Sequence, residues 1–169
     1  MRRWLVGGVL AAAWLAGCQV QWISQYDEVT DRGITDIQRS IERHLGQLEA
    51  LAAEPPGLDT LTEQCRPDRF TTFHEELDGG LRVLILRNEA REQNALTVEQ
   101  LKLLQSSLGM LREQQRERYT PTDAGREIRQ PGDRCLSAGQ VQLNRGIIEQ
   151  NIRAILKLEL AKRDFRKEE

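Results

Sequence analysis

The two histidines are the first residues to consider for chemistry, because imidazole is a common metal ligand and an acid–base group near neutral pH. His74 begins the segment His74-Glu-Glu-Leu-Asp78, which starts like the metal-binding helix of a zinc protease. The position four residues after His74 is Asp78, whereas a zinc protease needs a second histidine there to complete its ligand pair. The match is too short to predict a zinc-protease site.

His44 and His74 form the other candidate pair. His44 lies seven residues after Ile37 on one predicted helix, and His74 lies early on the next, so antiparallel packing places them at similar heights. Two histidines in a bundle core can hold haem, or a metal together with nearby glutamates. Against this, the Glu-x-x-His spacing of carboxylate metal bundles occurs nowhere in the chain. We therefore predict no metal and no non-covalent cofactor, and keep small-ligand, haem or metal binding near His44 and His74 as the alternative.

Motifs for catalysis are missing from the sequence. It contains no GxSxG, no P-loop, no Rossmann glycine pattern and no CxxCH haem attachment. No nucleophile, base and orienting residue can be grouped from their spacing. A cell-envelope enzyme is the disfavoured alternative, and a non-enzymatic protein is expected.

The chain has three cysteines, and Cys18 differs in its surroundings from Cys65 and Cys135. Cys18 follows a start with Arg2 and Arg3 and an apolar run from Trp4 to Leu15. This layout is typical of a secretory signal peptide. The run is too short for a membrane span, which takes about 20 apolar residues.

Leu15-Ala16-Gly17-Cys18 resembles the lipobox of bacterial lipoprotein precursors at all four positions. The resemblance implies cleavage before Cys18, a diacylglyceryl group on its thiol, and a further acyl chain such as palmitate on its amino group. Residues 1–17 would then be a cleaved signal, residues 18–25 a lipidated tether, and residues 26–169 the folded domain. Gln19 stands where inner-membrane lipoproteins often carry Asp, so the resemblance favours the outer membrane of a Gram-negative bacterium, facing the periplasm.

The net charge limits the class of partner, and the expected export predicts the state of the two remaining cysteines. Removing the two signal arginines from the 24 basic residues leaves 22 against 26 acidic ones, a net charge of −4. An acidic domain is not expected to bind nucleic acid. With Cys18 lipidated, Cys65 and Cys135 remain as an even pair in an oxidising compartment, which predicts a disulfide.

Apolar residues at steps of three and four predict four helices, over about 27–53, 67–93, 97–119 and from 137 onward, with residues 162–169 as a frayed end. Thr97-Val-Glu-Gln100 and Ser137-Ala-Gly-Gln140 read as capping boxes. Gly79-Gly80 either breaks the second helix or lets a neighbouring helix approach closely.

Four helices in series predict an all-α, up-down-up-down four-helix bundle. Cys65 and Cys135 precede the second and fourth helices, whose starts share one end of such a bundle, so the disulfide fits the topology. The first helix starts near the lipid anchor, so the disulfide is expected at the end far from the membrane.

Five arginines gather near that far end and are the candidate partner surface. Interleaved acids predict a solvated, mixed surface around them. With no catalytic motif and an expected lipid anchor, we expect a membrane-anchored adaptor or structural interaction module with a protein partner in the cell envelope. The arginines are Arg66, Arg69, Arg126, Arg129 and Arg134.

Overall fold

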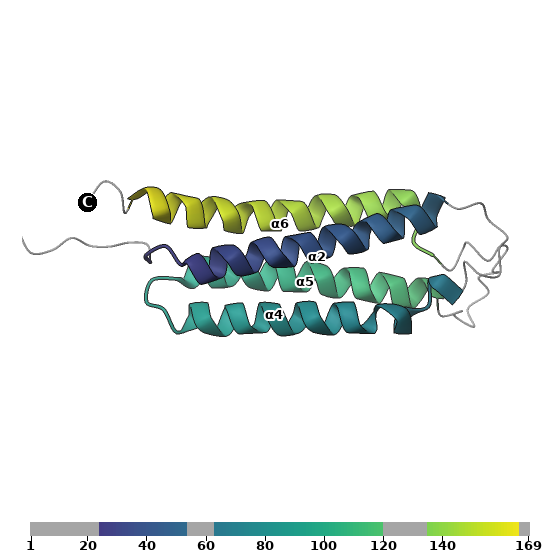
Figure 1. The fold of residues 1–169 in the computed structure, drawn as a ribbon, viewed down its shortest axis with the longest axis horizontal. Helices are drawn as coiled ribbons and strands as arrows, with labels where there is room; N and C mark the ends of the chain where they lie inside the picture. Colours follow the sequence, from purple (N-terminus) through teal and green to yellow (C-terminus); the bar gives the residue numbers. More distant parts are fainter. Residues whose placement is uncertain (1–23, 54–62, 120–134, 166–169) are drawn as a thin grey trace, which may run out of the picture.

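The computed structural model describes residues 24–53, 63–119 and 135–165. Its main elements are α2 (Glu28–Ala53), the 3₁₀ turn η1 (Pro67–Phe70), α4 (Thr71–Glu89), α5 (Ala95–Tyr119) and α6 (Ala138–Phe165). The four long helices run alternately up and down, as Figure 1 shows. This confirms the predicted all-α four-helix bundle. None of the described helices is long and apolar enough to cross a bilayer.

The helices close into a ring in which each contacts two neighbours. α5 packs against α4 and α6, and α2 packs against the same two helices. The start of α2, the α4–α5 turn and the end of α6 share one end of the bundle, here called the N-terminal end (Figure 1). The starts of α4 and α6 share the other end, here called the disulfide end.

The core follows the apolar stripes of the sequence. Since residues three and four apart fall on one helix face, each stripe turns inward and loses its contact with water. The most deeply buried apolar side chains come from all four helices: Ile34, Ile41, Leu45, Leu81, Leu101, Leu104, Leu111, Val141, Ile148 and Ile155.

The predicted disulfide is present. Cys65 and Cys135 are both buried, their Cα atoms are 5.4 Å apart, and the bond joins residues 70 apart in sequence. Leu51 at the end of α2 packs against it. The bond therefore ties the segment before α4 to the start of α6, as the topology requires.

The helix ends correct several sequence predictions. The second helix ends at Glu89, not near Gln93, because residues 90–94 form the turn into α5. α5 begins at Ala95, so Thr97 lies inside the helix, and its hydroxyl bonds to Glu159 rather than capping. The capping box at Ser137 is confirmed, because its backbone N–H donates to Gln140 Oε1 at 3.0 Å.

The glycine pair does not break α4, which is continuous from Thr71 to Glu89. A Cβ at Gly79 would meet open space, and one at Gly80 would come no closer than 3.8 Å to Ile37. Close approach instead occurs at Gly33 of α2, where a Cβ would lie 2.9 Å from Leu84 Cδ2. The prediction that the glycine pair allows close packing is therefore wrong, and Gly33 has that role.

Candidate functional site

The structure brings His44 and His74 together, as their predicted heights required. Their ring centroids are 5.7 Å apart, and both side chains are buried. His44 comes from the core side of α2, and His74 lies one turn into α4. The sequence thus located the pair correctly, although it did not identify the residue between them.

Gln115 of α5 links the two imidazoles. Its Oε1 is 2.7 Å from His74 Nε2, and its Nε2 is 3.3 Å from His44 Nε2. An amide oxygen only accepts and an amide nitrogen only donates. His74 must therefore donate from Nε2, and His44 must accept at Nε2 and carry its own proton on Nδ1.

Aromatic rings enclose His44 on the α4 side. Phe73 stacks on it with centroids 3.8 Å apart, and Phe70 meets it edge-on at 5.0 Å. Burial, followed by the nearby His74, lowers the pKa of His44 from 6.5 to about 3. Burial also lowers the pKa of His74. Both rings are therefore neutral at pH 7.

Gln115 uses its amide oxygen for His74 and its amide nitrogen for His44. Both Nε2 atoms are thus engaged with Gln115. Within the described ranges, no three His, Cys, Asp or Glu residues group as a cation site.

A groove between α2 and α4 opens onto His44. It has a volume of about 610 Å³, with Phe70, Phe73 and Leu51 among its apolar lining residues and Arg43 and Arg69 among its charged ones. His74 lines a different hollow of about 520 Å³, between the start of α4 and α5. The histidines therefore face two grooves on either side of α4.

Acidification is expected to destabilise the fold through His44. The unfolded imidazole binds a proton below about pH 6.5, while the folded one stays neutral down to about pH 3, so stability falls as the pH drops through that window. Between pH 7.5 and pH 5 the loss from His44 alone is about 2 kcal/mol. Urea unfolding at both pH values measures it. His44→Leu should shrink the difference by about that amount, and an unchanged pH dependence in the variant would contradict the buried neutral imidazole.

Of the five candidate arginines, the structure describes Arg66 and Arg69. Arg66 bonds to Glu63 at 3.2 Å and to Asp68 at 3.0 Å, and these carboxylates raise its pKa. Its charge is therefore balanced locally. Arg69 is exposed beside the histidine groove, with no ion pair to another described residue. Arg126, Arg129 and Arg134, like Cys18, lie outside the described residues.

A buried polar network at the N-terminal end escaped the sequence analysis. Lys162 Nζ donates to Glu159 Oε1 at 2.6 Å, and to Asn94 Oδ1 and Thr97 Oγ1 at 2.7 Å each. The Lys162 and Glu159 side chains are only 2% and 0% exposed. Lys162 is therefore a core residue of α6 and not part of a frayed end.

The network continues into the start of α2. Ser24 Oγ donates to Asn94 Oδ1 at 2.6 Å, and Ser24 N–H donates to the Gln93 carbonyl at 3.2 Å. Asp27 accepts two bonds from the Arg87 guanidinium, at 2.8 and 2.9 Å, which hold its pKa well below the usual range. These bonds fasten the chain entering α2 to the end of α4 and to the α4–α5 turn.

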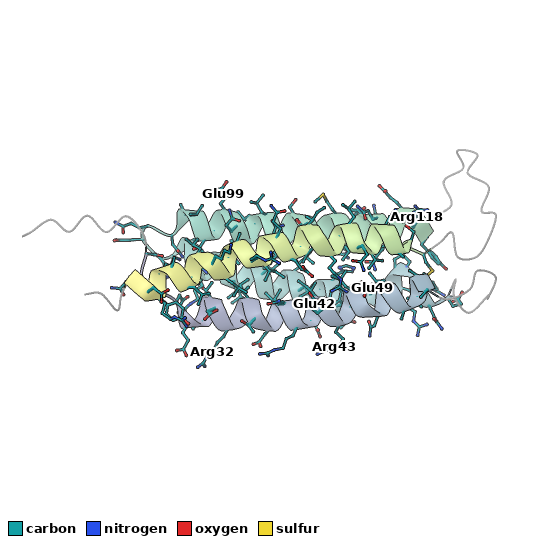
Figure 2. The ribbon with its side chains drawn as sticks, turned by 90° about the horizontal axis from the view of Figure 1, so that it is seen from above. Arg32, Glu42, Arg43, Glu49, Glu99 and Arg118 are labelled. Carbon is teal, nitrogen blue, oxygen red and sulfur yellow. A yellow bond between two sulfur atoms is a disulfide. The ribbon has the colours of Figure 1, made fainter. Side chains whose placement is uncertain are left out.

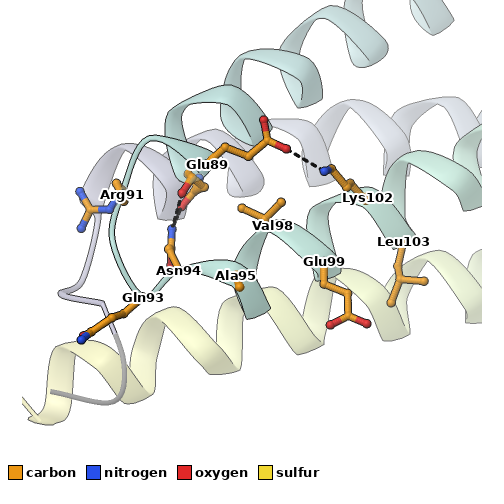
Figure 3. Close-up of a pocket in the computed structure, with 10 residues that line it drawn as sticks. Glu89, Arg91, Gln93, Asn94, Ala95, Val98, Glu99, Lys102 and Leu103 are labelled. Carbon is orange, nitrogen blue, oxygen red and sulfur yellow. Dashed lines mark hydrogen bonds and ion pairs between the residues drawn. The ribbon is translucent and has the colours of Figure 1, made fainter. Parts of the chain in front are cut away.

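A hollow of about 640 Å³ lies over this turn (Figure 3). Glu89 and Lys102 form an ion pair of 2.7 Å across it, and Asn94 bonds to Asn88. Its lining residues include no serine, cysteine or histidine. Most of its polar groups bond to one another, so the hollow offers no reactive constellation.

Comparison with known proteins assigns no family. No family model, no curated protein and no solved structure matches the chain. The function must therefore be argued from the residues and their geometry.

Proposed function

We propose that this protein is a non-enzymatic lipoprotein of the cell envelope, held by a lipid on Cys18 and acting as an adaptor or structural interaction module. The location we favour is the outer membrane, facing the periplasm. The observation that carries the proposal is the lipobox-like Leu15–Cys18 stretch behind an apolar signal segment. Two or more acyl chains at one residue give stable anchoring, whereas a single chain binds reversibly.

The fold is consistent with an anchor at one end. Ser24 lies six residues after Cys18, a reach of roughly 21 Å when fully extended. The bonds of Ser24 to Asn94 and Gln93 hold the tether against the bundle end. The disulfide end would then stand about 40 Å further out, the length of a 26-residue helix.

A partner is expected at the disulfide end. A photo-crosslinking residue placed at Arg69 in living cells should capture a defined envelope protein, because Arg69 is exposed there and forms no ion pair with another described residue. The matched position is Glu28, exposed at the opposite end. Mass spectrometry of the captured product identifies the partner.

Two controls make this crosslinking decisive. Cys18→Ser should release the protein from the membrane and reduce capture at Arg69, since the anchor fixes its location. If Arg69 captures nothing reproducible, or if Glu28 captures the same product equally well, the adaptor function loses its support.

Ligand binding in the histidine groove is the second candidate function. It is favoured by the groove of about 610 Å³ beside His44, Phe70 and Phe73. An absorbance spectrum and metal analysis of the purified protein test its haem and metal forms. A Soret band or stoichiometric metal would support it, and the absence of both would reject these two forms.

A further inference from the structure

The outer face formed by α5 and α6 carries apolar residues where a solvated bundle surface is normally polar. Leu96, Leu103 and Met110 recur every seven residues along α5, and Leu143 and Ile147 lie on α6. Their exposed fractions run from 38% to 63%. We call these five residues the α5–α6 face. Large exposed apolar patches, especially those rimmed by polar residues, mark interaction sites.

Hydrogen bonds along the seam between the helices show that these side chains flank it. Asn151 Nδ2 donates to Ser107 Oγ at 2.7 Å, and Asn144 Nδ2 donates to Gln114 Oε1 at 2.7 Å. Leu103 and Met110 each lie one turn before the seam residue of α5, at Ser107 and Gln114. Ile147 lies one turn before Asn151. The apolar residues of both helices therefore border one continuous seam.

The margins of this face carry opposite charges. Glu99 lies between Leu96 and Leu103 in helical spacing, and Lys157 lies in the equivalent spacing between Ala154 and Ala161 on α6. Both are exposed, and neither has an ion pair with another described residue. Figure 2 shows Glu99 on the outer edge of α5.

Glu99 and Lys157 also lie at the same height. Thr97 bonds to Glu159 across these antiparallel helices. Glu99, two residues after Thr97, is therefore level with Lys157, two residues before Glu159. The α5 margin thus carries the acidic residue Glu99, and the α6 margin carries the basic residue Lys157. A partner with the same two margins in exchanged order would complement both.

The size of the face fits a stable interface. A 25-residue helix is about 37 Å long, and two helices about 10 Å thick make a footprint of roughly 700 Å². Stable protein interfaces bury about 800 Å² on each partner.

We propose that the α5–α6 face binds a second copy of this chain in a parallel, two-fold symmetric dimer. In this arrangement the symmetry axis runs along the bundle, so α5 of one copy lies against α6 of the other. Glu99 then meets the second copy's Lys157, and the pair repeats by symmetry. The parallel direction rests on the proposed function, because two lipid anchors in one membrane place both N-terminal ends on the same side.

Crosslinking within membranes tests the dimer and its direction together. A photo-crosslinking residue replaces Met110 in the full-length chain, expressed in two differently tagged copies. Met110 lies between the Ser107–Asn151 and Gln114–Asn144 bonds, level with Ile147. We expect a product of twice the mass that contains both tags, with the crosslink mapped to α6 near Ile147 of the second copy. Capture on α5 of the second copy would overturn the parallel arrangement, and no doubled product would overturn the dimer.

Matched variants distinguish binding through the α5–α6 face from non-specific association of exposed apolar side chains. Leu103→Arg should lower the doubled product at least tenfold, while Leu86→Arg, at a more exposed apolar position on α4 (60% against 46%), should leave it unchanged. Glu99→Lys should lower it about fivefold, and Glu99→Lys with Lys157→Glu should restore it. Equal effects of the Leu103 and Leu86 variants would overturn the proposal.

The mass of the uncrosslinked chain reports the lipid separately. A lipidated chain without the doubled product rejects the dimer alone. An unlipidated chain that still crosslinks from Met110 to α6 rejects the anchor and retains the face.

Discussion

Lys162→Met is expected to lower the free energy of unfolding by about 3–5 kcal/mol, because it leaves the Glu159 carboxylate buried without its cation. Glu159 is fully buried, and among the described residues only Asp27 N–H and Thr97, both at 3.3 Å, would still donate to it. Urea unfolding followed by circular dichroism measures the loss.

Two further variants show whether the burial of the Glu159 carboxylate causes this loss of stability. Adding Glu159→Gln to Lys162→Met should recover most of the stability, since the amide is neutral and keeps an oxygen that can accept from Asp27 N–H. Lys102→Met, which removes an exposed ion pair with Glu89, should cost no more than about 1 kcal/mol. If the Lys162 and Lys102 variants lose equal stability, Lys162 is not a buried partner of Glu159.

The paired change Cys65→Ser and Cys135→Ser is expected to destabilise the protein by about 4 kcal/mol. The disulfide closes a 70-residue loop, and its loss restores the freedom of that loop in the unfolded chain. Both cysteines change together, so that no buried thiol is left free to react. Urea unfolding of the variant and of the oxidised protein gives the difference.

Chemical reduction of the disulfide in the unmodified protein supplies the comparison for the double variant. The unmodified protein with a reducing agent should unfold at the midpoint of the double variant, and the same agent should not shift the variant itself. A midpoint that reduction leaves unchanged in the unmodified protein would show that the bond adds no stability.

The bundle could be predicted because its physical signals are local and repeated. Apolar spacing of three and four defined the helices, and the positions of Cys65 and Cys135 fitted an alternating topology. Ser137 and Gln140 cap α6 as their spacing indicated. Thr97 and Gln100 have the same spacing but do not cap, because Asn94 precedes the helix start and Thr97 turns inward to Glu159.

The buried network could not be read from residue types, since lysine and glutamate are rarely fully buried unless paired. A positional signal was nevertheless present. Ile152, Ile155, Glu159 and Lys162 follow steps of three, four and three, so the two charged residues continue the apolar stripe of α6. Their partners are Asp27 just before α2, Asn94 in the α4–α5 turn and Thr97 of α5, and only the fold brings these together.

A similar limit applies to the histidine pair. Helix lengths placed His44 and His74 at one height, but Gln115 lies on a third helix, and no local pattern distinguishes it from the glutamines around it. Arg145 of α6 likewise pairs with residues distant in sequence. Its partners are Glu42 and Glu49 of α2, both labelled in Figure 2. Contacts between distant segments thus supplied the chemistry that the sequence pattern lacked.

The mass of the mature N-terminus tests the central claim, a lipid-anchored bundle, most directly. The full-length protein is expressed in a Gram-negative host and extracted from its membranes. The masses of the intact chain and of its N-terminal peptide are then measured by mass spectrometry. The account predicts a chain that begins at Cys18 and exceeds the mass of residues 18–169 by that of its acyl and glyceryl groups. A chain that retains residues 1–17, or begins at an unmodified residue, would contradict it.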